Sequence, residues 1–162
     1  MSKIHPFLWY DTQAEEAAKL YVSLFPNSRI TAVARNTEAA PGPTGAVLTV
    51  EFELDGMKVV ALNGGPHFKP TEAFSFTIEC ESQAEVDRYW NALLADGGEP
   101  SQCGWLKDRF GLSWQVTPTI LPKLLTDPDR AKAGRAMAAM MTMAKIDIAA
   151  IEAAAAGEPV AG

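Results

Sequence analysis

The chain has 162 residues, about the length of one domain, and 48% of them are hydrophobic, which is enough for a packed core. Its formal net charge of −6 repels phosphate backbones and argues against nucleic acid as a partner. No apolar run approaches the roughly 20 residues that span a bilayer, and Asp11 interrupts the apolar segment near the N-terminus. We therefore expect no membrane partner and a cytoplasmic location.

The first elements in chain order are a strand and a helix. PFLWYD, residues 6–11, is a short aromatic-rich run typical of a strand. Thr12 and Glu15 fit a capping box, in which each side chain accepts from a backbone N–H at the start of a helix. Pro26 lies just past the last apolar position of helical spacing, where the helix must end.

Three strands are predicted to follow this helix. SRITAVAR gives the first of them. VLTVEFELDGMKVVALNG gives the other two as a hairpin hinged on Asp55-Gly56, a strong hairpin signal. The first half of the chain therefore has the order strand, helix, strand, strand, strand.

The second half repeats this order. FSFTIECE, residues 74–81, predicts a strand, and Ser82 with Glu85 forms a second capping box. The tripeptide Gln-Ala-Glu at 83–85 repeats the one at 13–15, so the period is about 70 residues.

The last predicted strands are a short extended piece near residues 99–102, WLKD, and LSWQVTP, the latter two hinged on Arg109-Phe110-Gly111. Asp108 is expected to serve this turn by accepting backbone N–H groups. Two βαβββ modules result, over about residues 4–66 and 72–118, within a domain spanning 1–118.

A helical extension is predicted over residues 119–156. TILPKLLTD carries a short helical turn, Asp127-Pro128-Asp129 starts a longer helix, and Asp147 lies near the start of a third. This extension contributes a dimer contact or a cover over the sheet, or it simply closes one sheet edge. Residues 157–162 are expected to be a disordered tail.

The paired modules resemble the vicinal oxygen chelate superfamily, which includes glyoxalase I. More narrowly, the chain resembles the PhnB-like group, often labelled 3-demethylubiquinone-9 3-methyltransferase. The matching stretches are PFLWYDTQAEEAAKLYVSLFPNS, LTVEFELDGMKVVALNGGPHF, FSFTIECESQAEVDRYWNALL and GGEPSQCGWLKDRFGLSWQVTP. This resemblance implies an α+β fold whose curved mixed sheet forms a cup, a site on the concave face, and a homodimer.

The resemblance does not bring a metal site with it. The acidic ligand of metal-bearing relatives aligns with Gln115, and a histidine ligand aligns near Ala73. A neutral amide and an alanine are poor substitutes for these ligands, and His5 alone at a ligand-like position makes no site. Glu51 and Glu53 either form an exposed strand face or add oxygen ligands. We expect no metal and no cofactor.

The methyltransferase label is not supported by a cofactor-binding motif in the sequence. The one glycine-rich candidate for a nucleotide-type site, Asn63-Gly64-Gly65-Pro66, follows a strand but leads into another strand and not into a helix. We therefore expect no methyl transfer. His67, in the loop that follows, is a lid residue or is simply solvated.

Strand alternation places several candidate binding residues on one face of the sheets. An aromatic wall with a few polar groups fits a pocket for a small, partly apolar molecule. The candidates for substrate contact are Phe7, Trp9, Asn63, Cys103, Trp105, Lys107 and Gln115. Two of them have an alternative role without substrate contact. Cys103 can be a buried apolar residue, and Lys107 can be half of a surface ion pair.

Three functions remain open at this level. The first is a metal-independent small-molecule binding protein of the glyoxalase type. The second is an enzyme on a small oxygenated substrate that uses Glu51, His5 or Cys103 as base or nucleophile. A scaffold acting through its dimer surface is the remaining alternative.

Overall fold

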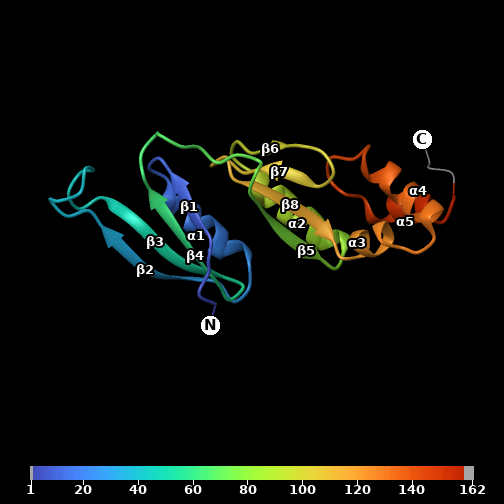
Figure 1. Ribbon diagram of the computed structural model, residues 1–162, viewed down its shortest axis with the longest axis horizontal. Helices are drawn as coiled ribbons and strands as arrows, with labels where there is room; N and C mark the ends of the chain where they lie inside the picture. The colour runs from blue at the N-terminus through green and yellow to red at the C-terminus, as the bar shows by residue number, and fades with distance from the viewer. Residues whose placement is uncertain (1, 159–162) are drawn as a thin grey trace. The chain divides into compact units, whose positions relative to one another are not determined.

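The computed structural model describes residues 2–158 and has the α+β architecture predicted from the sequence (Figure 1). The chain divides between Pro70 and Thr71 into two compact units, and each contains one four-stranded mixed sheet. The two βαβββ modules are confirmed. The joining of their sheets into one cup stays a prediction.

The first unit contains β1 (Phe7–Tyr10), α1 (Ala14–Leu24), β2 (Arg29–Arg35), β3 (Val47–Leu54) and β4 (Met57–Asn63). Its strand order is β1-β4-β3-β2, with β1 parallel to β4 and the other pairs antiparallel. Helix α1 packs on one face of this sheet, mainly on β3 and β4.

The core of the first unit lies between α1 and the sheet. Val50 and Phe52 of β3 are fully buried, while Glu51 between them is not, as alternation along the strand requires. The helix contributes alanines that permit close approach, and its Tyr21 hydroxyl lies 2.8 Å from that of Tyr10.

Asp55 and Gly56 form the predicted two-residue hairpin turn between β3 and β4. Both have positive φ, 47° and 82°, as a type I′ turn requires. This turn pairs Leu54 with Met57 and so fixes the register of the whole hairpin.

The predicted capping box of Thr12 and Glu15 is wrong. The helix begins at Ala14, and no side chain of the residue before it caps the first turn. Instead, the N–H of Ala14 donates to Oδ1 of Asn63 at 2.8 Å, so a distant strand end supplies the cap.

The second unit contains β5 (Ser75–Cys80), α2 (Gln83–Leu94), β6 (Glu99–Pro100), β7 (Trp105–Lys107) and β8 (Ser113–Pro118), in the equivalent strand order β5-β8-β7-β6. Here the predicted cap is present, since Ser82 Oγ accepts from the N–H of Glu85 at 3.2 Å. Trp114, on the helix side of β8, is 2% exposed.

Asp108 organises the turn between β7 and β8, as predicted. Its Oδ1 accepts from the N–H groups of Phe110 and Leu112, and its Oδ2 accepts from the indole N–H of Trp114 at 2.9 Å. A buried carboxylate thereby joins the turn to the largest core side chain of the strand.

The extension forms α3 (Ile120–Leu125), α4 (Arg130–Met140) and α5 (Ile148–Ala155), which pack on one another within the second unit (Figure 1). Asp129 and Asp147 cap α4 and α5 by accepting from backbone N–H groups three residues on. Of the tail predicted to be disordered, residues 159–162 lie outside the described residues.

The extension is also fixed to the turn that precedes β7. The N–H groups of Cys103 and Gly104 donate to the carbonyls of Met143 and Ala144, both at 2.8 Å. Cys103 and Gly104 have positive φ, 59° and 84°, which turns both donors toward the extension.

No helix within residues 2–158 is both long enough and apolar enough to cross a membrane.

Candidate functional site

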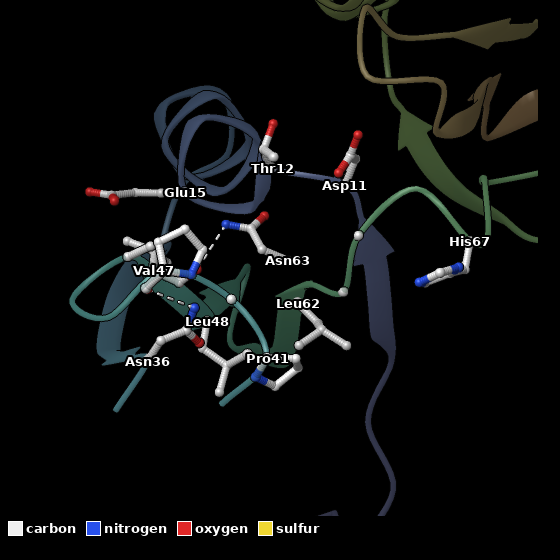
Figure 2. Close-up of a pocket in the computed structure, with 15 residues that line it drawn as sticks. Asp11, Thr12, Glu15, Asn36, Pro41, Val47, Leu48, Leu62, Asn63 and His67 are labelled. Atoms are coloured by element: carbon white, nitrogen blue, oxygen red, sulfur yellow. Dashed lines mark hydrogen bonds between the residues drawn. The ribbon is translucent and has the colours of Figure 1, made fainter. Parts of the chain in front are cut away.

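The first unit has a pocket of about 630 Å³ where β1 and β4 end and β3 begins (Figure 2). Four segments line it: the β1–α1 junction, the loop 36–46, the start of β3 and the loop after β4. The lining residues are Asp11, Thr12, Glu15, Asn36, Pro41, Gly42, Pro43, Ala46, Val47, Leu48, Leu62, Asn63, Gly64, Gly65 and His67. Its volume is within the about 300–1,000 Å³ typical of small-molecule sites.

Asn36 lines this pocket and carries an unsatisfied acceptor. Its backbone N–H donates to Ala46 O at 2.8 Å and its Nδ2 donates to Pro43 O at 3.2 Å, so the loop holds the side chain in place. Its Oδ1 is buried and has no hydrogen-bond partner among residues 2–158. Buried polar atoms are normally satisfied, so this oxygen is suited to a donor on a ligand.

Gly42 is needed for the same arrangement. A Cβ on Gly42 would lie 2.5 Å from Asn36 Nδ2, which is closer than any real contact. A larger residue at this position would therefore displace the Asn36 amide from the wall.

Asn63 was predicted to contact substrate, and it does line the pocket. Its amide, however, already makes two internal hydrogen bonds: Oδ1 accepts from Ala14 N–H, and Nδ2 donates to Val47 O at 3.1 Å (Figure 2). The residue fixes the start of α1 and the start of β3 at the pocket wall.

The charge of this pocket is acidic. Asp11 and Glu15 carry carboxylates, and no lysine or arginine is among the described lining residues. Glu15 also forms an exposed ion pair with Lys19 at 3.0 Å. Together with the Asn36 oxygen, these groups offer acceptors between apolar walls, which favours a ligand that carries hydrogen-bond donors.

Trp9 explains the glycine pair that follows β4. Its indole N–H donates to Gly65 O at 2.9 Å, and a Cβ on Gly64 would lie only 2.4 Å from its ring. The ring edge also meets Phe68, with 4.9 Å between centroids. The two glycines therefore accommodate the Trp9 indole, and they do not form the phosphate-binding turn of a nucleotide site.

The other candidates of the first unit lie on the sheet face away from α1. Phe7 of β1 is 58% exposed, and Glu51 of β3 lies on the same face. Glu51 accepts from Thr31 Oγ1 at 3.4 Å and lies 3.6 Å from Lys58 Nζ. His5 precedes β1 and is half-buried.

Three candidates lie together in the second unit. Trp105 is the cross-strand partner of Gln115, and Lys107 is that of Ser113. Gln115 Nε2 donates to Ser75 Oγ at 3.0 Å, and Lys107 pairs with Glu72. Trp105 and Lys107 line a second, smaller pocket.

The two cysteines are both free. Cys103 Sγ lies 3.7 Å from Met141 Sδ of the extension, apart from both pockets. Burial raises the pKa of the Cys80 thiol to about 12, so this thiol stays protonated near neutral pH.

Among residues 2–158, no group of three or more His, Cys, Asp or Glu side chains is arranged to hold a metal ion. The first pocket has one histidine and two carboxylates in its lining, His67, Asp11 and Glu15, and they form no such group.

The family model described as 3-demethylubiquinone-9 3-methyltransferase matches residues 2–117. The chain belongs to this PhnB-like family. The match ends at the close of β8, so the helical extension lies outside the part that defines the family.

Solved structures agree with this assignment. A PhnB protein from Bacillus cereus is 33% identical, covers 73% of this chain and 100% of its own, and gives a TM-score of 0.67. Protein PA1353 from Pseudomonas aeruginosa is 21% identical over 73% of this chain and 98% of its own, with a TM-score of 0.60.

The fold also extends to an antibiotic-resistance protein. The fosfomycin resistance protein FosX from Listeria monocytogenes is 16% identical, covers 77% of this PhnB-like chain and 97% of its own, and gives a TM-score of 0.56. At this identity the likeness shows the fold alone. No curated protein matches the chain.

The sequence did not single out the loop 36–46, which builds much of the larger pocket. One signal was present: the loop is rich in Pro and Gly and is longer than the two to five residues of ordinary hairpin loops, and long ordered loops are often functional. The position of Asn36 within it gave no such signal.

Proposed function

We propose that this PhnB-like protein binds a small, partly apolar molecule in the pocket of its first module, without a metal ion. The observation that carries the proposal is that Asn36 lines a pocket of about 630 Å³ while its buried Oδ1 has no hydrogen-bond partner among residues 2–158. The proline and aliphatic walls supply the apolar contact.

The acidic charge of the pocket limits which classes of ligand are expected to bind. With Asp11 and Glu15 at the wall and no cation among the described lining residues, an anion is disfavoured. The expected ligand carries an ammonium, amide or hydroxyl donor on an apolar body.

Three probes of similar shape test this proposal: benzylamine, benzyl alcohol and benzoate, titrated into the full chain and followed by amide NMR shifts. We expect benzylamine to bind best and benzoate least. Asn36→Ala should weaken benzylamine and benzyl alcohol binding by about tenfold, the worth of one hydrogen bond. Asn91→Ala, on the exposed side of α2, is the matched control.

Substitutions of the two neighbouring glutamates, Glu15 and Glu16, distinguish the effect of pocket charge on binding from the effect of pocket shape. Glu15→Gln should weaken benzylamine binding and leave benzyl alcohol unchanged, while Glu16→Gln, outside the pocket, should alter neither. Equal binding of all three probes by wild type and Asn36→Ala protein would contradict the proposal.

The absence of a metal is tested separately by thermal unfolding. A ligand that binds the native state must stabilise it, so excess Zn²⁺, Ni²⁺ or Mg²⁺ should leave the melting temperature as it is in EDTA. A rise of several degrees with any of these ions would show that the proposal of metal-independent binding is wrong.

We do not extend the proposal to catalysis. Glu51 is engaged with Thr31 and Lys58, and Cys103 faces Met141 in the other compact unit, so no observation favours an enzyme built on these groups. Methyl transfer finds no support, because the indole of Trp9 fills the space beside Gly64 and Gly65.

We further propose that the protein acts as a homodimer in the cytoplasm. The family resemblance supports the dimer, and two free cysteines fit a reducing compartment. Light scattering after gel filtration should give twice the chain mass of 17.4 kDa. A mass of one chain at micromolar concentration would contradict the dimer.

A further inference from the structure

The second unit has a pocket of its own, of about 210 Å³, on the sheet face away from α2. It is independent of the site proposed above, because all its residues belong to the other compact unit. The volume is below the about 300–1,000 Å³ of drug-sized sites, so any occupant is small. The residues that decide its chemistry are Glu72, Glu99, Ser101, Trp105, Lys107 and Ser113.

Ser113 is the most unusual member. Only 1% of it is exposed, and its Oγ has no hydrogen-bond partner among residues 2–158. Gln115, two residues along the same face, does find a partner in Ser75. A buried hydroxyl without a partner is unfavourable, and this one borders a cavity, so a partner from outside the chain can satisfy it.

Lys107 brings a charge to the same place. It is the cross-strand partner of Ser113, so the ammonium group and the hydroxyl lie on neighbouring strands of one face. In this structure the ammonium pairs with the carboxylate of Glu72, which is largely exposed on the segment before β5. The hydrogen bond between them lowers the pKa of Glu72 and raises that of Lys107.

The polar side chains of this pocket are one ammonium, two hydroxyls and two carboxylates. The ammonium of Lys107 and the hydroxyls of Ser113 and Ser101 call for acceptors on the ligand, and Trp105 offers an apolar wall. The pair with Glu72 shows that the Lys107 ammonium can donate to a carboxylate at this position. Glu99 adds a second negative charge to the wall and so disfavours a ligand with more than one.

We propose that this pocket binds a small monocarboxylate, which replaces Glu72 on Lys107 and accepts a hydrogen bond from Ser113. Glu72 is then an internal competitor that occupies the lysine when the ligand is absent. The first pocket has no lysine or arginine among its described lining residues and the second has Lys107, so the two pockets would bind ligands of opposite charge.

Propionate, propionamide and propylamine, titrated into the ¹⁵N-labelled full chain, test this proposal. We expect propionate alone to shift the Trp105 indole N–H and the Ser113 amide saturably. The Asn36 side-chain amide reports binding at the other pocket, so the two proposals fail or succeed separately.

Four variants assign the contacts. Lys107→Gln and Ser113→Ala should each weaken propionate binding by about tenfold, the worth of one hydrogen bond, whereas Glu72→Gln should tighten it several-fold by removing the competitor. Glu79→Gln, on the same face but outside the pocket, should change nothing.

Three results would overturn the proposal: no shift at Trp105 and Ser113 at high propionate, which would mean a pocket that holds only water; equal binding of propionamide; or weaker binding to Glu72→Gln. The last result does not depend on how well a buried substitution is tolerated, because Glu72 is exposed.

Discussion

The two modules have one topology and build it with different local interactions. In the first, β2 and β3 are long, with seven and eight residues, and the loop 36–46 between them walls a large pocket. In the second, β6 and β7 have only two and three residues, and a tight turn at Cys103-Gly104 is bonded to the extension. The two modules share their strand order. The lengths of their second and third strands, and the segment that joins these strands, determine what each module can bind.

The helix starts differ in the same way. Asn63, a distant strand end, caps α1, whereas α2 is capped by its own Ser82. The hairpin turns differ as well: Asp55-Gly56 relies on backbone conformation, and the β7–β8 turn relies on the buried carboxylate of Asp108. A duplicated fold therefore does not imply duplicated stabilising contacts, and the four pairs of substitutions below test where these contacts differ.

The largest effect is expected from Trp114→Ala in the second module. The side chain is 2% exposed, meets Phe76 with 5.0 Å between ring centroids, and donates to Asp108, so its loss should cost about 3–5 kcal/mol of unfolding free energy. The Trp9 indole of the first module is only half-buried. Trp9→Ala should therefore lower the unfolding free energy by less than half as much as Trp114→Ala. Urea unfolding monitored by far-UV circular dichroism measures both. Equal losses would mean that the second module does not depend on a buried tryptophan more than the first.

Gly104→Ala tests the bond between the second module and the extension. Gly104 has φ of 84°, and an added Cβ would lie 2.9 Å from Val116 O and 3.1 Å from Ile146 Cγ1. Strain and crowding together should cost about 2–3 kcal/mol.

Gly111→Ala is the matched control, because Gly111 has φ of 88° and open space around its Cβ position. It should cost about 1 kcal/mol, from backbone conformation alone. If the two variants unfolded at the same urea concentration, the close packing of Gly104 against Val116 and Ile146 would not limit the residue at this position.

Asn63→Ala compares the two helix starts. It removes two hydrogen bonds, one to Ala14 and one to Val47, and should cost about 2 kcal/mol. Ser82→Ala removes only one bond, to Glu85, and should cost about 1 kcal/mol. A larger loss for Ser82→Ala would show that the remote cap is the weaker one.

Most of the fold could be predicted from the sequence, because strand alternation, turn residues and the repeated Gln-Ala-Glu are local signals. Asp55-Gly56 and the turn role of Asp108 were recognised in this way. The cap on α1 could not be, since Asn63 is far from Ala14 in sequence and meets it only after β4 pairs with β1.

The candidate sites were less predictable than the fold. The pairing of β7 with β8 brings Trp105, Lys107 and Gln115 to one face, because side-chain direction in a strand has a period of two. Strand alternation could not show that Lys107 meets Glu72, or that the loop 36–46 folds over Asn36, because both depend on how irregular segments close.

The smallest effect, and the only gain, is expected from Ser113→Ala. Ser113 and Ser75 are cross-strand partners on one face, but Ser75 Oγ accepts from Gln115 while Ser113 Oγ has no partner among residues 2–158. Removing the unsatisfied hydroxyl should raise the unfolding free energy by about 0.5–1 kcal/mol, whereas Ser75→Ala should lower it by a similar amount. Urea unfolding at matched protein concentration measures both.

Excess propionate should stabilise the wild type more than Ser113→Ala. The gain in stability from Ser113→Ala should therefore be smaller with propionate, because the ligand supplies the acceptor that Ser113 lacks. A loss of stability in Ser113→Ala without propionate would show that the hydroxyl already has a partner, and the pocket of the second module would then lose its reason to bind one.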